Sequence, residues 1–150
     1  MNLEFNLNGT NKTYHGPAGK NVQELLQSMG IYSVRKTEEK VGFCGSDIIL
    51  LNGKIVNAGL LIAAQLEGKR IDTVESLSKP GTLSPVQSAL VDCGLVQSAY
   101  NSPASALVLS ELLSRIPDPN KEDIIDALSS IYIRDTGYQQ YFKAVELAIK

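Results

Sequence analysis

The chain has 150 residues, of which 43% are hydrophobic and 20% are charged, and its formal net charge at neutral pH is −2. These values are ordinary for a soluble globular protein with enough apolar material for a packed core. Lys and Arg residues never stand more than two together, so the sequence offers no basic patch for a nucleic-acid backbone.

The start of the chain and its cysteines indicate where the protein works. The first residues, MNLEFNLNGT, lack the basic start and apolar run of a secretory signal peptide, and no apolar stretch approaches membrane-spanning length. The two cysteines, Cys44 and Cys93, suit a reducing compartment in which thiols stay unpaired. We therefore expect a cytoplasmic protein without a membrane segment.

The first part of the sequence predicts two strands and a helix. Residues 3–7 alternate apolar and polar side chains, which is the period of a half-buried strand. The Asn8-Gly9 pair is a hairpin signal, and a second strand is expected through Thr13 and Tyr14. A helix ending near Gly30 is then indicated by apolar residues at helical spacing, namely Val22, Leu25, Leu26 and Met29.

A continuously apolar stretch, IILL at residues 48–51, predicts a strand that is covered on both faces. The Asn52-Gly53 pair predicts a second hairpin, with residues 54–56 returning beside the first strand. Residues 60–66 favour a helical turn and residues 71–74 a last strand. Two hairpins with a helix across them predict a β-grasp sheet.

Helix start signals dominate the rest of the chain. Ser84-Pro85 and Ser102-Pro103 each place a capping residue before a proline, Asn120 provides a third cap, and Gly137 precedes a fourth apolar stripe. Four short helices of this kind predict a compact bundle.

A composition break separates the two patterns. Residues 76–83, which begin SLSKPGT, contain a Pro-Gly pair and little apolar content, so they are read as a linker. The expected fold class is therefore α+β, with a β-grasp domain at residues 1–75 followed by a four-helix bundle domain at residues 84–150.

Four segments, in this order, carry a family resemblance: GFCGSDIILLNGKIVNAGLL, LEGKRIDTVESL, LSPVQSALVDCGLVQS and IRDTGYQQYFKAVELA. They resemble the plant-ferredoxin-type loop and the helical motifs of the iron–sulfur subunit of molybdenum hydroxylases. That family includes xanthine dehydrogenase, aldehyde oxidoreductase and carbon monoxide dehydrogenase. The resemblance covers nearly the whole chain and implies a ferredoxin-like first domain.

In that family, eight cysteines hold two [2Fe-2S] clusters. The resemblance places the ligand positions of the first cluster on Glu39, Cys44, Asp47 and Gly59, and those of the second on Ser98, Asn101, Ile133 and Asp135. Among these residues, Cys44 alone is a cysteine, and clusters are normally held by thiolates. We therefore predict degenerate sites, with both clusters absent and no cofactor or metal bound.

Three interpretations of Cys44 stay open. It is an inert thiol in a remnant loop, a ligand of another metal together with Glu39 and Asp47, or a reactive thiol. Gly42 and Gly45 would let the loop wrap tightly.

The remaining candidate residues are interpreted conservatively. Cys93 lies on an apolar helix stripe and is expected in the core, and His15, the sole histidine, is expected on the surface at a turn. No nucleophile, base or carboxylate dyad accompanies it, so no catalytic residue is predicted. Gln97 corresponds to a family glutamine near the pterin cofactor of the large subunit. Gln97 and Tyr138 are therefore candidate partner contacts, with capping, packing or a helix start as the alternatives.

These observations lead to three functional hypotheses. The first is a redox-silent homologue of the iron–sulfur subunit, not an enzyme on its own, which acts as a structural or interaction subunit beside a molybdopterin large subunit or a flavin subunit. The second is an electron-transfer subunit with an unconventional metal centre. The third is a stand-alone binding module that reuses the scaffold.

Overall fold

A computed structural model of the protein describes residues 1–35, 42, 44–134 and 136–150. The predictions for Glu39 and Asp135 lie outside these residues. The strands are β1 (Asn2–Leu7), β2 (Thr10–His15), β3 (Ile48–Leu51), β4 (Lys54–Asn57) and β5 (Arg70–Asp72). The helices are α1 (Val22–Ser28), α2 (Pro85–Asp92), α3 (Ser102–Arg115), α4 (Lys121–Leu128) and α5 (Tyr138–Ile149). Short 3-10 turns occupy Ala58–Leu60, Ala63–Leu66 and Val74–Ser76.

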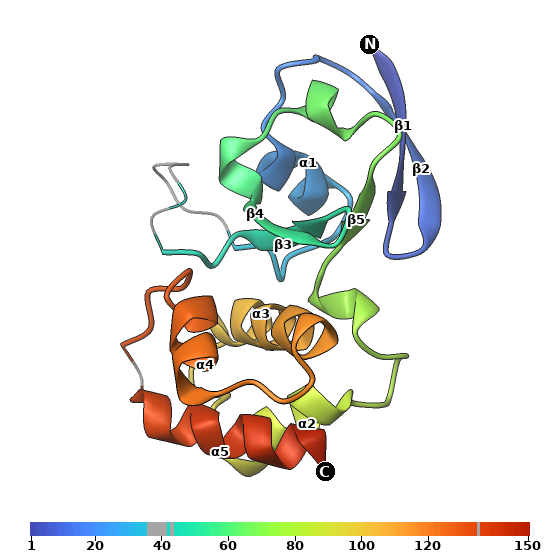
Figure 1. Cartoon of the computed structure of the whole chain (residues 1–150). Helices are drawn as coiled ribbons and strands as arrows, with labels where there is room; N and C mark the ends of the chain where they lie inside the picture. The colour runs from blue at the N-terminus through green and yellow to red at the C-terminus, as the bar shows by residue number, and fades with distance from the viewer. Residues whose placement is uncertain (36–41, 43, 135) are drawn as a thin grey trace.

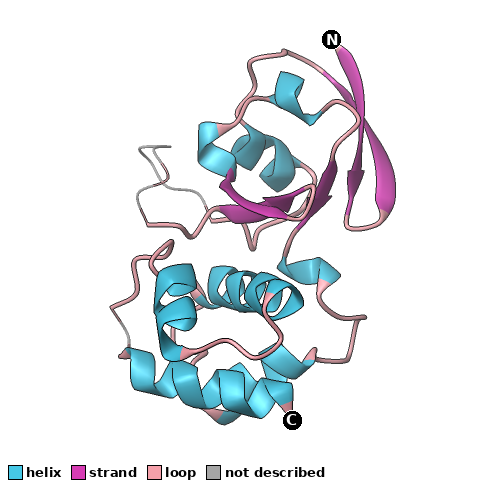
Figure 2. Ribbon diagram, viewed as in Figure 1, coloured by secondary structure: helices cyan, strands magenta, loops and turns pink. Residues whose placement is uncertain are grey.

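The strands form one mixed sheet in the order β2-β1-β5-β3-β4, in which β1 and β5 are parallel and the other neighbours antiparallel. Both predicted hairpins are confirmed. Asn8 and Gly9 have φ angles of 50° and 81°, and Asn52 and Gly53 have 52° and 79°. Two successive positive φ angles are what a two-residue type I′ turn requires. The protein is α+β, and Figures 1 and 2 show the strands and α1 gathered apart from α2–α5.

One face of the sheet is covered by α1. Leu3, Phe5 and Leu7 of β1 are buried on this face, in alternation with more exposed neighbours, as the sequence predicts. They pack in one apolar core with the buried residues of α1, which include Leu25 and Leu26. This packing positions the hairpins and the loop that precedes β3.

The opposite face of the sheet is covered by the helical half. Consecutive residues of a strand point to opposite faces, so Ile48 and Ile49 of β3 face different cores. Ile49 packs in the core with α1, whereas Ile48 packs with Leu107 and Val108 of α3. The prediction that this strand is covered on both faces is therefore confirmed.

The last strand is shorter than predicted. It ends at Asp72 because the next residue, Thr73, forms two hydrogen bonds with the side chain of Asn8. The Thr73 N–H donates to Asn8 Oδ1 over 2.8 Å, and Asn8 Nδ2 donates to Thr73 Oγ1 over 2.9 Å. The chain then turns into the 3-10 turn Val74–Ser76, and Val74 packs against the helical core. Val74 therefore packs with the helices and is not part of the sheet.

The helix starts follow their predicted caps, with one shift. Ser84 and Gln87 form a reciprocal capping box at the start of α2, and Asn120 caps α4. At α3 the residue before the helix is Asn101, not Ser102, because Ser102 is already helical and its Oγ donates to the Ser98 carbonyl over 2.7 Å. None of the described helices is long and apolar enough to cross a membrane.

A close contact joins the loop before β3 to the segment after α4. Gly45 has a φ angle of 69°, and a Cβ atom added there would lie 2.0 Å from the backbone oxygen of Ser130. Next to this contact, the Tyr132 N–H donates to the Cys44 carbonyl over 2.9 Å. Only glycine therefore fits at residue 45 without moving one backbone segment away from the other.

Replacing Gly45 by Ala should lower the free energy of unfolding by more than the same change at Gly94. Gly94 has the same φ angle of 69°, but a Cβ there would meet nothing within 4 Å. Both variants carry the left-handed strain of about 1–2 kcal/mol, and G45A adds an overpacking cost of about 1–3 kcal/mol. Urea denaturation measures both. Equal losses would show that the Gly45–Ser130 contact does not constrain the fold.

Candidate functional site

The candidate site is the region where the two sets of resemblance-derived ligand positions come near each other. Cys44 is half-buried, and its Sγ lies 2.5 Å from Ser46 Oγ. The Tyr100 side chain also hydrogen-bonds to Ser46 and Cys44. Burial raises the pKa of Tyr100 above its usual value, and the negative charge that Cys44 can carry raises it further. Cys44 thus touches the loop that precedes α3.

Asp47 is fully buried and connects two of the predicted positions directly. Its Oδ2 accepts the Gly59 N–H over 2.7 Å, and its Oδ1 accepts Asn57 Nδ2 over 2.9 Å. Hydrogen bonds to an ionised carboxylate are among the stronger ones in proteins. In addition, Asn21 Nδ2 donates to the Gly59 carbonyl over 2.8 Å. We call the Asp47, Asn57 and Gly59 contacts the Asp47 clasp, because they tie the loop before β3 to the end of β4.

The second set of positions is joined by backbone and amide bonds. Ser98 Oγ accepts the N–H groups of Tyr100 and Asn101, over 3.3 and 3.4 Å. Asn101 Nδ2 donates to the Tyr132 carbonyl over 3.4 Å, which brings the loop before α3 to the segment before α5. Ile133, next to Tyr132, is half-buried and packs against both cores of the helical half.

Cys44 is the one cysteine at the predicted ligand positions that the structure describes. Among the residues that the structure describes, no three His, Cys, Asp or Glu side chains are grouped as a metal site. Both oxygens of Asp47 are engaged in the Asp47 clasp, and Glu39 lies outside the described residues. The described residues thus give no support to the interpretation in which Cys44, Glu39 and Asp47 hold a different metal, and no chemical step is derived through a metal.

Cys93 packs against the helical core and His15 lies on the surface, as expected, and Gln97 and Tyr138 are both exposed. Cys93 is the half-buried C-cap of α2 and packs against the helical core. His15 is exposed at the end of β2, with Nδ1 2.8 Å from Asn2 Oδ1. Gln97 is exposed between α2 and α3, and Tyr138 is exposed at the start of α5 with its ring stacked on Phe142.

Sequence reasoning missed the contribution of Arg35. Its Nε and Nη2 both donate to the Ala99 carbonyl, over 3.2 and 2.9 Å, so a residue of the first half holds the loop before α3. In the sequence, the positive charge of Arg35 is the only feature that suggests a bond, and it does not identify an acceptor 64 residues away.

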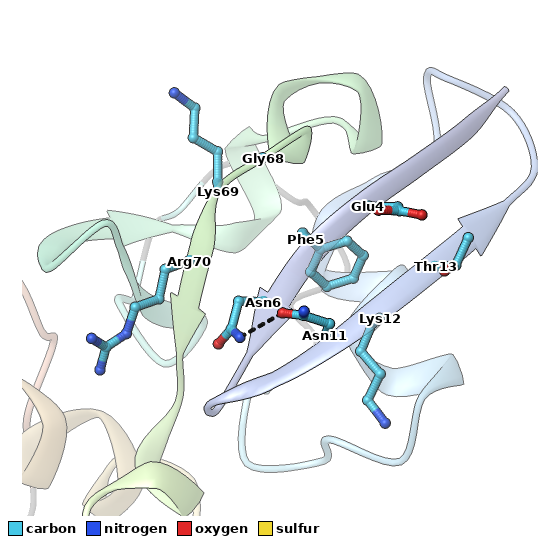
Figure 3. Close-up of a pocket in the computed structure, with 9 residues that line it drawn as sticks. All are labelled: Glu4, Phe5, Asn6, Asn11, Lys12, Thr13, Gly68, Lys69 and Arg70. Carbon is cyan, nitrogen blue, oxygen red and sulfur yellow. Dashed lines mark hydrogen bonds between the residues drawn. The ribbon is translucent and has the colours of Figure 1, made fainter.

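A hollow of about 360 Å³ lies over β1, β2 and the start of β5 (Figure 3). Figure 3 shows the charged ends of Lys12, Lys69 and Arg70 pointing away from one another. Arg70 Nε lies 2.8 Å from Asp72 Oδ2, and Asn6 donates to Asn11 over 2.9 Å. The hollow therefore presents no converging set of cations to an anion, and we do not assign it a ligand.

Replacing Asp47 by Asn should destabilise the protein without a change in shape. The amide oxygen of the new Asn side chain can still accept one of the two hydrogen bonds. Its NH2 group would then face the other donor, either the Gly59 N–H or Asn57 Nδ2, and a donor cannot bond to a donor. Leaving a buried donor unpaired costs about 1–3 kcal/mol. Urea denaturation measures the loss, and D118N, at an exposed aspartate, should stay within about 0.5 kcal/mol of wild type. An equally small loss for D47N would show that the Asp47 clasp does not hold the loop.

This chain is similar to proteins of one family. Residues 73–146 match the family model described as [2Fe-2S] binding domain. The chain is 32% identical over 150 residues to the xanthine dehydrogenase iron-sulfur-binding subunit of Escherichia coli O157:H7, covering 97% of this chain and 92% of that subunit.

In two other proteins, the region similar to this chain is part of a longer protein. Over 149 residues it is 53% identical to the Escherichia coli K12 protein named "Probable hypoxanthine oxidase XdhD", covering 99% of this chain but 16% of that relative. The structure of the aldehyde oxidoreductase from Desulfovibrio desulfuricans superposes with a TM-score of 0.92 at 26% identity, covering 99% of this chain and 17% of that one. The chain thus spans about a sixth of the length of these two proteins.

These similarities correct the prediction that the protein has no cofactor and that [2Fe-2S] clusters are absent. The helical half matches a [2Fe-2S] binding domain, and a relative of similar length is named an iron-sulfur-binding subunit. The family therefore points to an iron–sulfur cofactor. The prediction was wrong because it treated a count of thiolates at resemblance-derived positions as sufficient to exclude the group.

The resemblance inferred from the four sequence segments is confirmed by the match over almost the full length of a separate subunit. The fold agrees, because the superposition covers 99% of the chain. The chain belongs to the family of iron–sulfur subunits of xanthine dehydrogenase and aldehyde oxidoreductase.

Proposed function

We propose that the chain is a structural or interaction subunit of a xanthine dehydrogenase-type molybdenum hydroxylase complex. The observation that carries this proposal is the match to 92% of a separate xanthine dehydrogenase subunit. That relative is named as a subunit, and a subunit works in contact with partners, so the match supports a role of the same kind for this chain. The proposed partners are a molybdopterin large subunit or a flavin subunit.

The proposed role is redox-silent in the sense that it rests on the shape and docking surface of the chain, and it does not require the absence of the iron–sulfur cofactor to which the family points. Two observations support it. The Asp47 clasp fixes the loop before β3 through protein groups, and Asn101 and Tyr132 join the two loops of the helical half in the same way. The loops that the resemblance assigns to cofactor ligands are thus ordered by hydrogen bonds within the chain.

The layout that we propose for this role keeps the ranges expected from the sequence. A β-grasp, ferredoxin-like domain spans residues 1–75, a linker spans 76–83, and a four-helix domain spans 84–150. The sheet order and the core formed by α2–α5 support this division. Gln97 and Tyr138, both exposed, are the proposed partner contacts, and the cytoplasm is the proposed location.

Electron transfer is the second candidate function, and the family match favours it. Residues 73–146 match a [2Fe-2S] binding domain, and the xanthine dehydrogenase relative is named for iron–sulfur binding. Cys44 is the one thiol at the resemblance-derived positions, so it is the residue on which this function would depend.

One experiment separates the two functions. The tagged chain is purified without oxygen from its own host, co-purifying proteins are identified by mass spectrometry, and iron, labile sulfide and substrate-dependent dye reduction are measured. We expect a molybdopterin-type partner, and we expect C44S to leave both the complex and its dye-reduction rate unchanged. C93S is the matched control, because Cys93 packs against the helical core.

Each contrary result has a defined meaning. A loss of iron together with at least about a tenfold slower dye reduction in C44S alone would replace the structural role by electron transfer. A chain that co-purifies with neither kind of partner would contradict both functions.

A further inference from the structure

The two hairpin turns carry the same dipeptide in different surroundings. Asn8-Gly9 joins β1 to β2, and Asn52-Gly53 joins β3 to β4. Leucine precedes both pairs, and their φ angles are nearly equal, 50° and 81° at the first turn against 52° and 79° at the second. Local sequence and turn geometry therefore give the two asparagines similar intrinsic reactivity.

An asparagine followed by glycine can lose its side-chain amide, because glycine has no side chain to hinder its backbone nitrogen. The glycine nitrogen gives up its proton to solvent base and attacks Cγ of the asparagine. The new N–Cγ bond closes a succinimide ring, the Cγ–Nδ2 bond breaks, and Nδ2 leaves as ammonia after it takes a proton from water. Water then opens the ring to aspartate or isoaspartate, so the net reaction is hydrolysis of the amide.

The side-chain carbonyl is activated in the same way at both turns. Asn8 Oδ1 accepts the Thr73 N–H over 2.8 Å, and Asn52 Oδ1 accepts the Arg70 N–H over 2.8 Å. Negative charge develops on this oxygen during the attack, and a backbone N–H already placed beside it stabilises that charge. This contact therefore does not distinguish the two asparagines.

At the first turn, both reacting nitrogens are engaged. The Gly9 N–H donates to Asn6 Oδ1 over 2.9 Å, so its proton is shielded from solvent base. Asn8 Nδ2, the leaving nitrogen, donates to Thr73 Oγ1 over 2.9 Å, and Asn8 is half-buried. Reaction at Asn8 must therefore break both of these hydrogen bonds.

At the second turn, the corresponding nitrogens face solvent. Asn52 and Gly53 are both exposed. Among the residues that the structure describes, none accepts a hydrogen bond from the Gly53 N–H or from Asn52 Nδ2. The Asn52 N–H donates to the Arg70 carbonyl over 2.8 Å, so the residue is anchored while its reacting nitrogens stay accessible.

We infer that Asn52 is a site of spontaneous deamidation in the folded protein and that Asn8 is protected. Deamidation places a carboxylate at the end of β3. Where the product is isoaspartate, the main chain also gains a methylene inside a two-residue turn, and turn length sets the register that pairs Leu51 with Lys54. The modification thus acts on the strand that both cores share.

Peptide mapping by mass spectrometry measures both sites in one sample. The full chain is incubated in mildly alkaline buffer, with and without urea, and aspartate and isoaspartate are quantified at each asparagine over time. We expect folded Asn52 to react at least about fivefold faster than folded Asn8, which is the rate factor of one hydrogen bond of ordinary net strength. In urea, where neither turn exists, we expect the difference to disappear.

The matched variant is T73V, which removes the acceptor of Asn8 Nδ2 and keeps the backbone donor to Asn8 Oδ1. It should raise the rate at Asn8 in the folded chain and leave the rate at Asn52 unchanged. Thermal melting checks that the variant is folded. If T73V melts early, N6A provides a second release, because it removes the acceptor of the Gly9 N–H.

The contrary results are distinct. Equal rates in the folded chain, a faster reaction at Asn8, or no reaction at either folded site would overturn the inference. A difference that persists unchanged in urea would also overturn it, because the selectivity would then come from the sequence and not from the contacts of the turns. A rate at Asn8 that neither T73V nor N6A raises would show that these contacts do not protect it.

Discussion

The two-sided burial of β3 is the constraint on which the rest of the structure depends. Ile49 points into the core with α1, and Ile48 points into the core with α3, so one short strand belongs to both halves of the chain. Burying an aliphatic side chain stabilises a fold by about 1.5–3 kcal/mol, and here the two contributions come from opposite faces. The halves therefore cannot shift against each other without exposing apolar surface on this strand.

The position of the candidate site follows from this strand. The loop with Cys44 and Asp47 leads directly into β3, so it is fixed at the junction of the halves rather than at the tip of one of them. From the helical side, Tyr132 bonds to the Cys44 carbonyl and Tyr100 bonds to its side chain. From the sheet side, Arg35 holds the loop at Ala99. The loops that the resemblance assigns to two separate ligand sets thus form one continuous region.

Local signals were enough to predict most of the fold. The Asn-Gly hairpins, the Ser84 and Asn120 caps and the two-sided strand are encoded within a few residues each, and the structure has all of them. The early end of β5 at Thr73 and the Arg35–Ala99 bonds were missed, since each joins residues more than 60 positions apart. The Asp47 clasp was missed for a different reason, since Asp47 bonds to residues only 10 and 12 positions away. A resemblance shows which positions correspond, but not which side chains bond to one another there.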